Sequence, residues 1–305
     1  MSVPRPRLHP DGPEVSGLVW GLWRALQSEE TATPDRLARM IAQCIDLGIT
    51  SFDHADIYGA YRVEALFGEA LSIWGGARRQ IEIVTKCGIR MVHPARPEHR
   101  FRHYDTSAAH IRSSVEASLR NLRTDYLDVL LLHRPDPLLD ADETAAALEE
   151  LVAAGKVRHV GVSNHLPAPI ELLQSRLKVP LVTNQIEFSV ARTEPLDDGT
   201  LDQAQRLRFR PMAWSPLGGG KLLQRLAGAG SALGDALDGV AAELGAVEPA
   251  QVALAWLMRH PSRPVPVIGT CRAERLRSLA NACAITLDRQ QWFRILAASR
   301  ERDVP

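Results

Sequence analysis

The chain has 305 residues, of which 45% are hydrophobic and 24% charged, and its 36 basic residues balance 36 acidic ones. This composition predicts a globular protein with a sizeable core, and the lack of a long basic block argues against nucleic acid as its main partner. The apolar runs are too short to cross a bilayer, the N-terminus lacks a signal-like apolar core and the four cysteines show no CxxC spacing, so we expect a cytoplasmic protein with reduced thiols and no membrane role.

Short apolar runs alternate with helical patterns from one end of the chain to the other. Most of these runs are continuous stretches of Val, Ile and Leu, which is typical of strands buried on both faces of a parallel sheet. The predicted strands, in chain order, are 17–21, 50–53, 81–86, 127–133, 159–162, 181–186, 210–214 and 265–268.

Residues that start and stop helices separate these strands. Thr33 before Pro34 predicts a helix N-terminus, and Gly48 predicts its end. Thr106 is expected to open a later helix, and Asp288 to cap the last one.

Eight strands that alternate with helices, without a repeat or a linker, predict one (β/α)8 barrel spanning residues 1–305 as a single domain. A doubly wound sheet is the alternative, but no GxGxxG follows the first strand. Two long segments, 89–106 and 217–245, follow the third and seventh strands. We expect both at the C-terminal face of the barrel, where such loops act as lids or substrate walls.

Four chemically competent side chains stand where apolar strands give way to loops: Asp53, Tyr58, Lys86 and His133. Reduction of a carbonyl needs a hydride and a proton donor with a suitable pKa, and since no side chain supplies a hydride, we expect a nicotinamide to supply it. We expect the Lys86 ammonium, held by Asp53, to lower the pKa of the Tyr58 phenol. His133 would orient the substrate oxygen.

Several segments together carry a family resemblance that covers nearly the whole chain: 53–59, 132–136, 156–164 and 214–220. With them the chain resembles an aldo-keto reductase, and its tail at 290–295 is similar to a bacterial branch whose members are named only as oxidoreductases. The resemblance implies an NAD(P)H-dependent oxidoreductase that reduces aldehydes or ketones to alcohols. In it Tyr58 would be the general acid, Asp53 and Lys86 its tuning partners, and His133 the substrate-orienting group.

The resemblance also implies a cofactor laid across the barrel mouth. Its contacts would be Gly21 and Trp23 at the nicotinamide and substrate, Ser163, Asn164 and Gln185 at the carboxamide, Trp214 stacked on the ring, Ser215, Leu217, Gly218 and Gly220 along the pyrophosphate, and Gly269, Thr270, Arg272 and Arg275 at the adenosine phosphate. Many family members have a Lys where Gly269 stands, so here Arg272 or Arg275 must supply the charge for a 2′-phosphate. NADPH is therefore favoured over NADH. The adenine contact, in the region of Leu279 or Asn281, stays open.

Other interpretations remain beside this one. A cofactor-sensing regulatory subunit of the same fold, with little turnover, is compatible with an intact tetrad. A metal-dependent barrel hydrolase could use His54 and Asp56, but one His without a further cluster predicts no metal site, and Asp56 is more readily a turn or capping residue. The sequence predicts a small-molecule carbonyl substrate without naming it, and it does not predict an oligomeric state.

Overall fold

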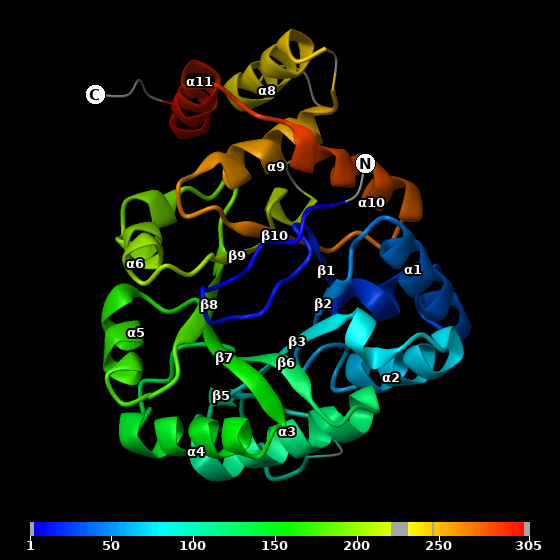
Figure 1. The fold of residues 1–305 in the computed structure, drawn as a ribbon, viewed down its shortest axis with the longest axis vertical. Coiled ribbons are helices and arrows are strands. Elements are labelled where there is room, and N and C mark those ends of the chain that lie inside the picture. The colour runs from blue at the N-terminus through cyan, green and yellow to red at the C-terminus, as the bar shows by residue number, and fades with distance from the viewer. Residues whose placement is uncertain (1–2, 95, 221–230, 246, 302–305) are drawn as a thin grey trace.

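Eight parallel strands close into a barrel in the computed structural model, which describes all residues except 1–2, 95, 221–230, 246 and 302–305. Their order around the barrel is β1-β10-β9-β8-β7-β6-β3-β2, and Figure 1 shows them at the centre of a ring of helices. The strands are β1 (Val19–Gly21), β2 (Ser51–Asp53), β3 (Glu82–Cys87), β6 (Leu127–Leu132), β7 (Val157–Ser163), β8 (Leu181–Glu187), β9 (Met212–Trp214) and β10 (Val265–Ile268).

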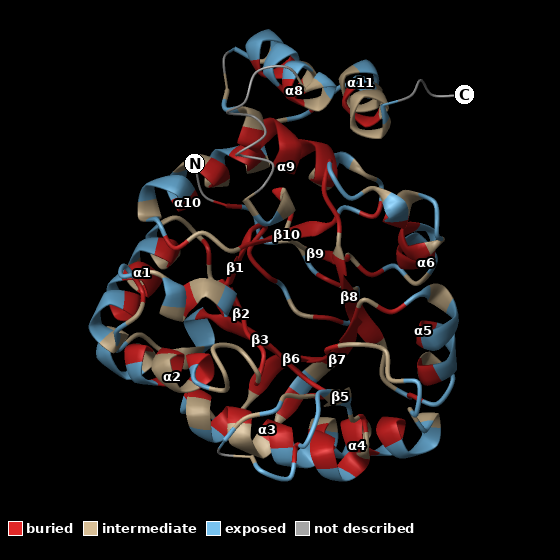
Figure 2. Ribbon diagram, turned by 180° about the vertical axis from the view of Figure 1, so that it is seen from behind, coloured by how far each residue is buried: buried red, intermediate tan, exposed pale blue. Residues whose placement is uncertain are grey.

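The predicted (β/α)8 barrel is thus confirmed, and each predicted strand overlaps an observed one. The expectation of strands buried on both faces also holds, since every residue of β3 and β6 is buried. Figure 2 shows the same for the barrel as a whole, with buried strands inside helices whose outer faces are exposed. Continuous apolar runs therefore arise because one face of each strand meets the barrel interior and the other meets the helices.

Most helices of the described chain cover the outside of the barrel. The helices are α1 (Pro34–Asp46), α2 (Val63–Trp74), α3 (Ala108–Leu122), α4 (Ala141–Ala153), α5 (Pro167–Gln174), α6 (Thr200–Arg206), α8 (Ala232–Glu243), α9 (Pro249–Arg259), α10 (Ala273–Ala280) and α11 (Arg289–Arg300). Figure 1 shows α8 and α11 outside the ring, beyond α9. Trp256 of α9 and Trp292 of α11 stack with ring centroids 4.9 Å apart, and each indole donates a hydrogen bond to the other residue's carbonyl.

Most of the predicted helix boundaries hold. The Thr33 side chain accepts a hydrogen bond from the Arg36 amide at the start of α1, and Asp288 caps α11 in a reciprocal capping box with Gln291. The prediction for Thr106 was wrong by one residue, because the Ser107 hydroxyl caps α3. Thr106 instead donates its hydroxyl to Asp136, which ties the loop before α3 to the loop after β6.

The barrel interior is filled by aliphatic side chains from most of the strands, among them Val19, Val84, Val129 and Val182. Leu8 and Val15, which precede β1, belong to the same buried cluster. The Leu8 carbonyl accepts a hydrogen bond from the Arg210 amide just before β9. The segment before β1 therefore seals the end of the barrel at which the strands begin, which leaves the opposite end as the place for a site.

The two long segments after β3 and β9 contain more structure than loops alone. Within 89–106, β4 (Ile89–Arg90) pairs antiparallel with β5 (His103–Tyr104). Within 217–245, a 3-10 turn η4 (Gly218–Gly220) is followed later by α8, and residues 221–230 lie outside the described chain. Sequence patterns of two residues are too short to reveal a ladder such as β4–β5, since its hydrogen bonds pair segments that are distant along the chain.

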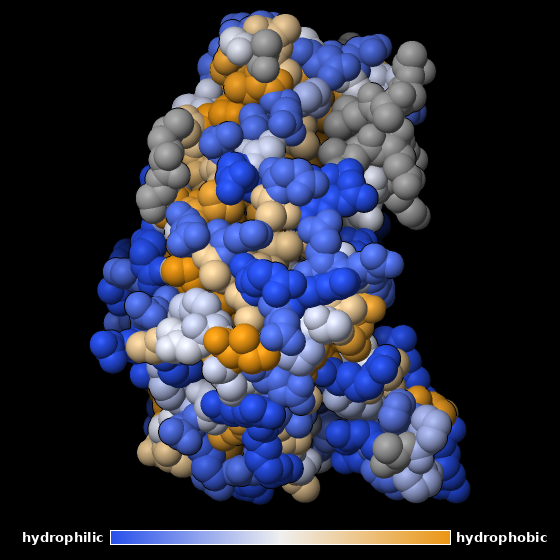
Figure 3. Space-filling model, turned by 90° about the vertical axis from the view of Figure 1, so that its right-hand side faces the viewer, coloured by the Kyte–Doolittle hydropathy of each residue, from blue (hydrophilic) through white to orange (hydrophobic). Residues whose placement is uncertain are grey.

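Hydrophilic side chains dominate the side of the molecule drawn in Figure 3, with apolar residues in small patches between them. No helix among the described residues has the combination of length and apolar character that crossing a bilayer requires.

A glycine at the contact between α2 and α3 provides a test of this packing. A Cβ built on Gly68 would lie 2.1 Å from the Asn121 carbonyl oxygen, far inside contact distance. We expect Gly68→Ala to lower the free energy of unfolding by about 3 kcal/mol, measured by denaturant or thermal unfolding.

The matched control is the same substitution at Gly239 in α8, where a Cβ would meet nothing within 4 Å. Gly239→Ala should stabilise the protein by roughly 0.5–1 kcal/mol, because alanine loses less backbone entropy in a helix. Equal stability of the two variants would contradict the close approach of α2 and α3.

Candidate active site

The four predicted catalytic side chains meet at the end of the barrel where the strands finish. Asp53 is the last residue of β2, Lys86 lies in β3, His133 follows β6 directly, and Tyr58 stands in the turn after β2. Because β2, β3 and β6 are neighbours in the sheet, their carboxyl ends bring these groups to one place.

Lys86 is the centre of this group. Its ammonium donates to both Asp53 carboxylate oxygens, at 2.7 and 2.8 Å, to the His54 carbonyl at 2.7 Å, and to the Tyr58 hydroxyl at 3.2 Å. Lys86 is 1% exposed and Asp53 2%. Burial by itself would lower the pKa of Lys86, but Asp53 and Tyr58 outweigh it and raise that pKa above its ordinary value. The side chain is therefore held as an ammonium.

The pKa of Tyr58 differs from the sequence-based expectation. Burial of the phenol raises its pKa; Lys86 opposes this effect, and the Asp53 charge adds to it. The net shift is upward rather than downward, chiefly because burial disfavours the charged phenolate, and the Asp53 carboxylate offsets part of the opposing effect of Lys86. Tyr58 is consequently a protonated donor at neutral pH.

His133 faces the same space, with its ring centroid 6.1 Å from that of Tyr58 at an interplanar angle of 76°. Burial lowers the pKa of His133 well below its usual range, and the positive charges of Lys86, Arg134 and Arg102 add to the effect. The imidazole is therefore neutral at pH 7 and carries one N–H that can donate a hydrogen bond.

A chain of hydrogen bonds joins the tetrad to the ends of β7, β8 and β9. Gln185 donates to Asp53 at 2.7 Å, and the Gln185 carbonyl accepts from the Ser163 hydroxyl at 2.9 Å. Asn164 donates to Ser163 at 2.7 Å and accepts from the Trp214 indole at 2.9 Å. Gln185 therefore couples this shelf of polar groups directly to Asp53, which the sequence did not reveal because the contact spans the barrel mouth.

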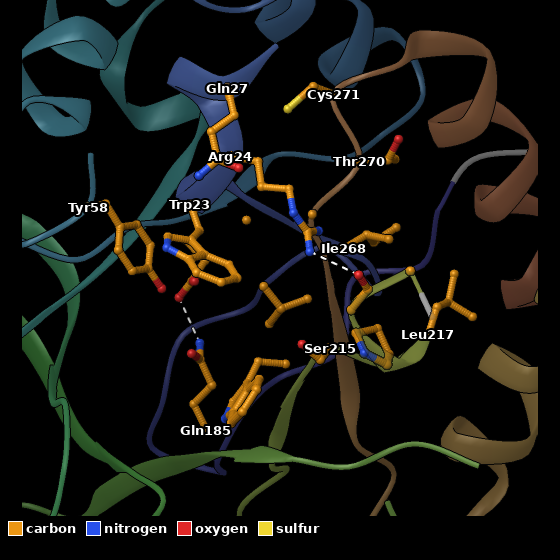
Figure 4. A pocket seen from close by; sticks show the side chains of 18 of the residues that line it. Trp23, Arg24, Gln27, Tyr58, Gln185, Ser215, Leu217, Ile268, Thr270 and Cys271 are labelled. Atoms are coloured by element: carbon orange, nitrogen blue, oxygen red, sulfur yellow. Dashed lines mark hydrogen bonds between the residues drawn. The ribbon is translucent and has the colours of Figure 1, made fainter. Parts of the chain in front are cut away.

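A cavity of about 1140 Å³ runs from the tetrad across the barrel mouth. Its volume exceeds the roughly 300–1,000 Å³ of an ordinary ligand pocket. Of the residues predicted to bind a cofactor, those that line it are Gly21, Trp23, Ser163, Gln185, Trp214, Ser215, Leu217, Gly220, Gly269, Thr270, Arg272 and Arg275. Figure 4 shows Tyr58, Trp23 and Gln185 at one end of this cavity and Leu217, Thr270 and Cys271 toward the other.

Three other predicted positions stand back from the cavity surface or beside it. Lys86 lies behind Asp53 and Tyr58, Asn164 supports Ser163 and Trp214, and Gly218 begins the turn η4. At the far end Leu279 lines the cavity, whereas Asn281 is not among its lining residues.

The cavity walls fit a long phosphate-bearing molecule such as a dinucleotide. The chain is in the left-handed region at Asn164 (φ 58) and Ser215 (φ 50), a conformation that costs energy for residues other than glycine and that is concentrated at functional sites. Among the described residues, none lies within 4 Å of a Cβ built on Gly220, which lines the cavity. Arg272 and Arg275 supply positive charge at one end.

Arg24 is a cavity residue that the sequence analysis missed. Its guanidinium donates to the Gly219 carbonyl at 3.0 Å, and Figure 4 shows it reaching across the cavity from η1 (Leu22–Gln27) toward the loop that carries Ser215. A Cβ on Gly269 would lie 3.3 Å from the same guanidinium. Glycine at position 269 thus leaves room for Arg24. The order of residues along the chain gives no sign of this contact, because η1 and Gly269 meet only in the closed barrel.

No group of three or more His, Cys, Asp or Glu side chains in the described chain is arranged to hold a metal ion. His54 is fully buried against the ring of Phe67, with centroids 4.4 Å apart, and its burial lowers its pKa to about 3.

Asp56 lies in the turn after β2, as the simpler interpretation expected, but it is more buried than a turn residue usually is. Its amide donates to the Lys86 carbonyl, and its carboxyl accepts a 3.3 Å hydrogen bond from Ser114 while Oδ1 has no partner among the described residues. Burial raises the pKa of Asp56 well above its usual range, and the charge of Glu64 adds to the shift.

A pH-dependent stability follows from Asp56. The folded pKa lies above the unfolded value of about 4, so the stabilising contribution is complete below that pH and is lost as the pH rises toward the folded pKa. Asp56→Asn cannot lose a proton. Its gain in unfolding free energy over the wild type should therefore grow with pH above about 4 and reach roughly 1–3 kcal/mol.

Thermal unfolding followed from pH 4 to 9 would measure this difference. Asp238→Asn, at an exposed position in α8, is the control and should show no such growth with pH. A constant difference between wild type and Asp56→Asn would contradict the raised pKa.

Comparison with known proteins gives consistent matches over the whole chain. A family model described as the aldo/keto reductase family matches residues 17–300. The chain is 50% identical to oxidoreductase YdhF of Escherichia coli over 99% of its own length and 100% of that protein's. It is 48% identical to a 6-dehydroglucose reductase of Agrobacterium fabrum, over 95% and 96% of the two chains. The crystal structure of an aldo/keto reductase from Klebsiella pneumoniae in complex with NADP and acetate matches with a TM-score of 0.75 and 26% identity, covering 99% of this chain and 97% of that one.

Proposed function

The chain belongs to the aldo/keto reductase family, and we propose that it uses NADPH to reduce aldehydes or ketones to alcohols, with Tyr58 as the proton donor. The observation that carries this proposal is the Lys86 ammonium, held by Asp53 and 3.2 Å from the Tyr58 hydroxyl. In that arrangement the Tyr58 hydroxyl provides the proton, and the Lys86 ammonium stabilises the phenolate that forms when the proton has left.

The proton transfer rests on the charges around Tyr58. Its raised pKa keeps the phenol protonated at neutral pH. As the proton moves to the substrate oxygen, negative charge develops on the phenolic oxygen, and the Lys86 ammonium lies at hydrogen-bond distance from that oxygen. A preorganised cation at the place where charge develops stabilises the transition state without reorganisation. Asp53 keeps the ammonium in position.

His133 would orient the carbonyl. A neutral imidazole that lines the cavity beside Tyr58 can donate its one N–H to the substrate oxygen without competing as an acid. Two donors would then hold that oxygen, His133 to position it and Tyr58 to protonate it.

When bound, NADPH supplies the hydride, which no side chain can provide. Ser163 and Gln185 would hold its carboxamide, the Trp214 indole would lie along the ring, and Arg272 and Arg275 would bind the 2′-phosphate. The lining of the cavity by all five residues supports this assignment. The NADP complex of the Klebsiella pneumoniae enzyme supports NADP(H) as the cofactor.

The relatives also bear on the substrate. The Agrobacterium fabrum protein is named a 6-dehydroglucose reductase, and a second one from Novosphingobium aromaticivorans with the same name is 39% identical to this chain. These names support a sugar-derived aldehyde as the substrate of the proposed reaction.

Replacement of the proton donor tests the mechanism. Tyr58→Phe keeps the ring and removes the hydroxyl, so we expect NADPH to bind with unchanged affinity while kcat for aldehyde reduction falls about 10²- to 10⁴-fold. NADPH fluorescence measures the binding, and NADPH absorbance measures turnover on a panel of aldehydes.

Tyr126→Phe is the control for this substitution. Tyr126 lies just before β6, at the other end of the barrel, with its ring between the guanidiniums of Arg78 and Arg158. That variant should retain full activity. Full activity of Tyr58→Phe would show that another group donates the proton. A wild type that binds NADPH tightly but reduces none of the carbonyls would instead favour a cofactor-sensing regulatory subunit.

The two arginines at the end of the cavity test the cofactor preference. The double variant Arg272→Gln, Arg275→Gln removes the charge proposed for the 2′-phosphate, so we expect KM for NADPH to rise roughly tenfold or more, with little change for NADH. Steady-state kinetics with the two cofactors measures this ratio. Arg277→Gln changes an exposed arginine of the same helix that does not line the cavity, and it should leave the ratio unchanged. An equal loss for NADPH and NADH would refute the assignment.

A further inference from the structure

Two arginines that the proposed mechanism does not use line the cavity beside the tetrad. Arg134 follows His133 directly, and Arg102 belongs to the segment between β4 and β5. Arg134 adjoins His133 in the chain, and the positive charges of both arginines contribute to lowering the pKa of His133, which lines the same cavity. The two come from different loops, and both line the same cavity.

Neither guanidinium has an acidic partner in the part of the chain that the structure describes. Among the described residues no carboxylate forms an ion pair with Arg134 or Arg102, although many other arginines are paired, as Arg90 is with Asp105 at 2.7 Å. The acid whose charge reaches Arg134 is Glu187, and it is paired with Arg192 at 3.7 Å. The half-buried Arg134 and the exposed Arg102 thus add positive charge to the cavity that no carboxylate of the described residues pairs with.

Arg134 is also half-buried, which makes the missing partner costly. Its Nη1 donates to the His133 carbonyl at 2.7 Å, and its guanidinium lies 5.9 Å from the centre of the Trp214 ring. Burial lowers the pKa of Arg134, and the charge of Arg102 adds to this effect. A guanidinium has five N–H donors in a planar fork that matches carboxylate and phosphate oxygens. Most of these donors are unused here.

The cofactor's phosphates do not account for these two cations. The proposed phosphate ligands Arg272 and Arg275 follow β10, whereas Arg134 follows β6. β6 and β10 are four strands apart in a closed barrel of eight, which places their carboxyl ends on opposite sides of the mouth. A dinucleotide held by Arg272 and Arg275 therefore leaves Arg134 and Arg102 facing the substrate.

We propose that Arg134 and Arg102 bind an oxyanion on the substrate, so that the preferred substrates are aldehydes or ketones bearing a carboxylate or phosphate group. The inference rests on the proposed carbonyl reduction and deepens it. The relatives are named for a sugar aldehyde that has no acidic group, so the oxyanion is inferred from the arginines and not from those names. Arg134, which lines the cavity next to His133, is the principal specificity-determining residue, and Arg102 assists it.

Two pairs of probes each compare an anionic aldehyde with a neutral one. The first is 4-oxobutanoate against its methyl ester, and the second is glyceraldehyde 3-phosphate against glyceraldehyde. We expect kcat/KM to be at least tenfold higher for the anionic member of one pair or both, and the advantage to shrink as salt concentration rises. The pair with the larger ratio shows whether carboxylate or phosphate fits the site.

Substitutions assign the effect to the arginines. Arg134→Gln should lower the anion-to-neutral ratio of kcat/KM roughly tenfold, mainly through KM, and Arg134→Lys should restore part of it. Arg102→Gln should lower the ratio less. Arg100→Gln, an exposed arginine of the same segment that does not line the cavity, is the control and should leave the ratio unchanged.

The outcomes distinguish this inference from the proposed function. If the neutral aldehydes are reduced and the anionic ones are no better, the oxyanion site is wrong while the proposed function stands. If the ratio is high but unaffected by Arg134→Gln, the arginines are not its cause and the inference also fails. If no member of either pair is reduced with NADPH, the proposed function itself fails.

Discussion

The buried ion pair between Lys86 and Asp53 is the interaction on which the site depends. Two charges out of water are stable only if nearly every donor and acceptor finds a partner, and removing one member of such a pair costs about 3–5 kcal/mol. The Lys86 ammonium meets this condition with both Asp53 oxygens, the His54 carbonyl and the Tyr58 hydroxyl. The same contacts that stabilise the charge also aim it at the phenol. The stability of the buried ion pair and the proposed role of Lys86 in proton transfer therefore depend on the same contacts.

The pair also joins the two halves of the barrel mouth. Asp53 ends β2 and accepts a hydrogen bond from Gln185 of β8, which is followed by Ser163, Asn164 and Trp214 at the ends of β7 and β9. The groups proposed to hold the nicotinamide are thus linked by hydrogen bonds to the residue that holds the Lys86 ammonium. A displacement of Asp53 would therefore disturb both Tyr58, the proposed proton donor, and the hydrogen-bonded groups proposed to hold the nicotinamide.

Arginines on opposite sides of the barrel mouth are proposed to bind two different groups, the 2′-phosphate of the cofactor and an oxyanion of the substrate. Arg272 and Arg275 follow β10, Arg134 follows β6 on the opposite side, and Arg24 reaches in from η1 to the Gly219 carbonyl. A parallel barrel makes this arrangement available because every strand ends at the same face, so each loop can carry its own charge. The proposed catalytic groups lie at or near the strand ends, and the proposed selectivity lies with the loops.

The sequence by itself determined the barrel and the identity of the tetrad. Apolar runs, helix caps and strand-end positions are local patterns, and they predict Asp53, Tyr58, Lys86 and His133 as one group because parallel strands end together. Only the tertiary structure decided the direction of the Tyr58 pKa, the bond from Gln185 to Asp53, the reach of Arg24 and the unpaired charge of Arg134. These depend on burial and on distances between segments far apart in the chain. Local sequence patterns give neither the burial of a side chain nor its distance from distant segments. The sequence of a strand shows which of its faces is apolar, but not which side chains from the other strands of the barrel its residues will contact.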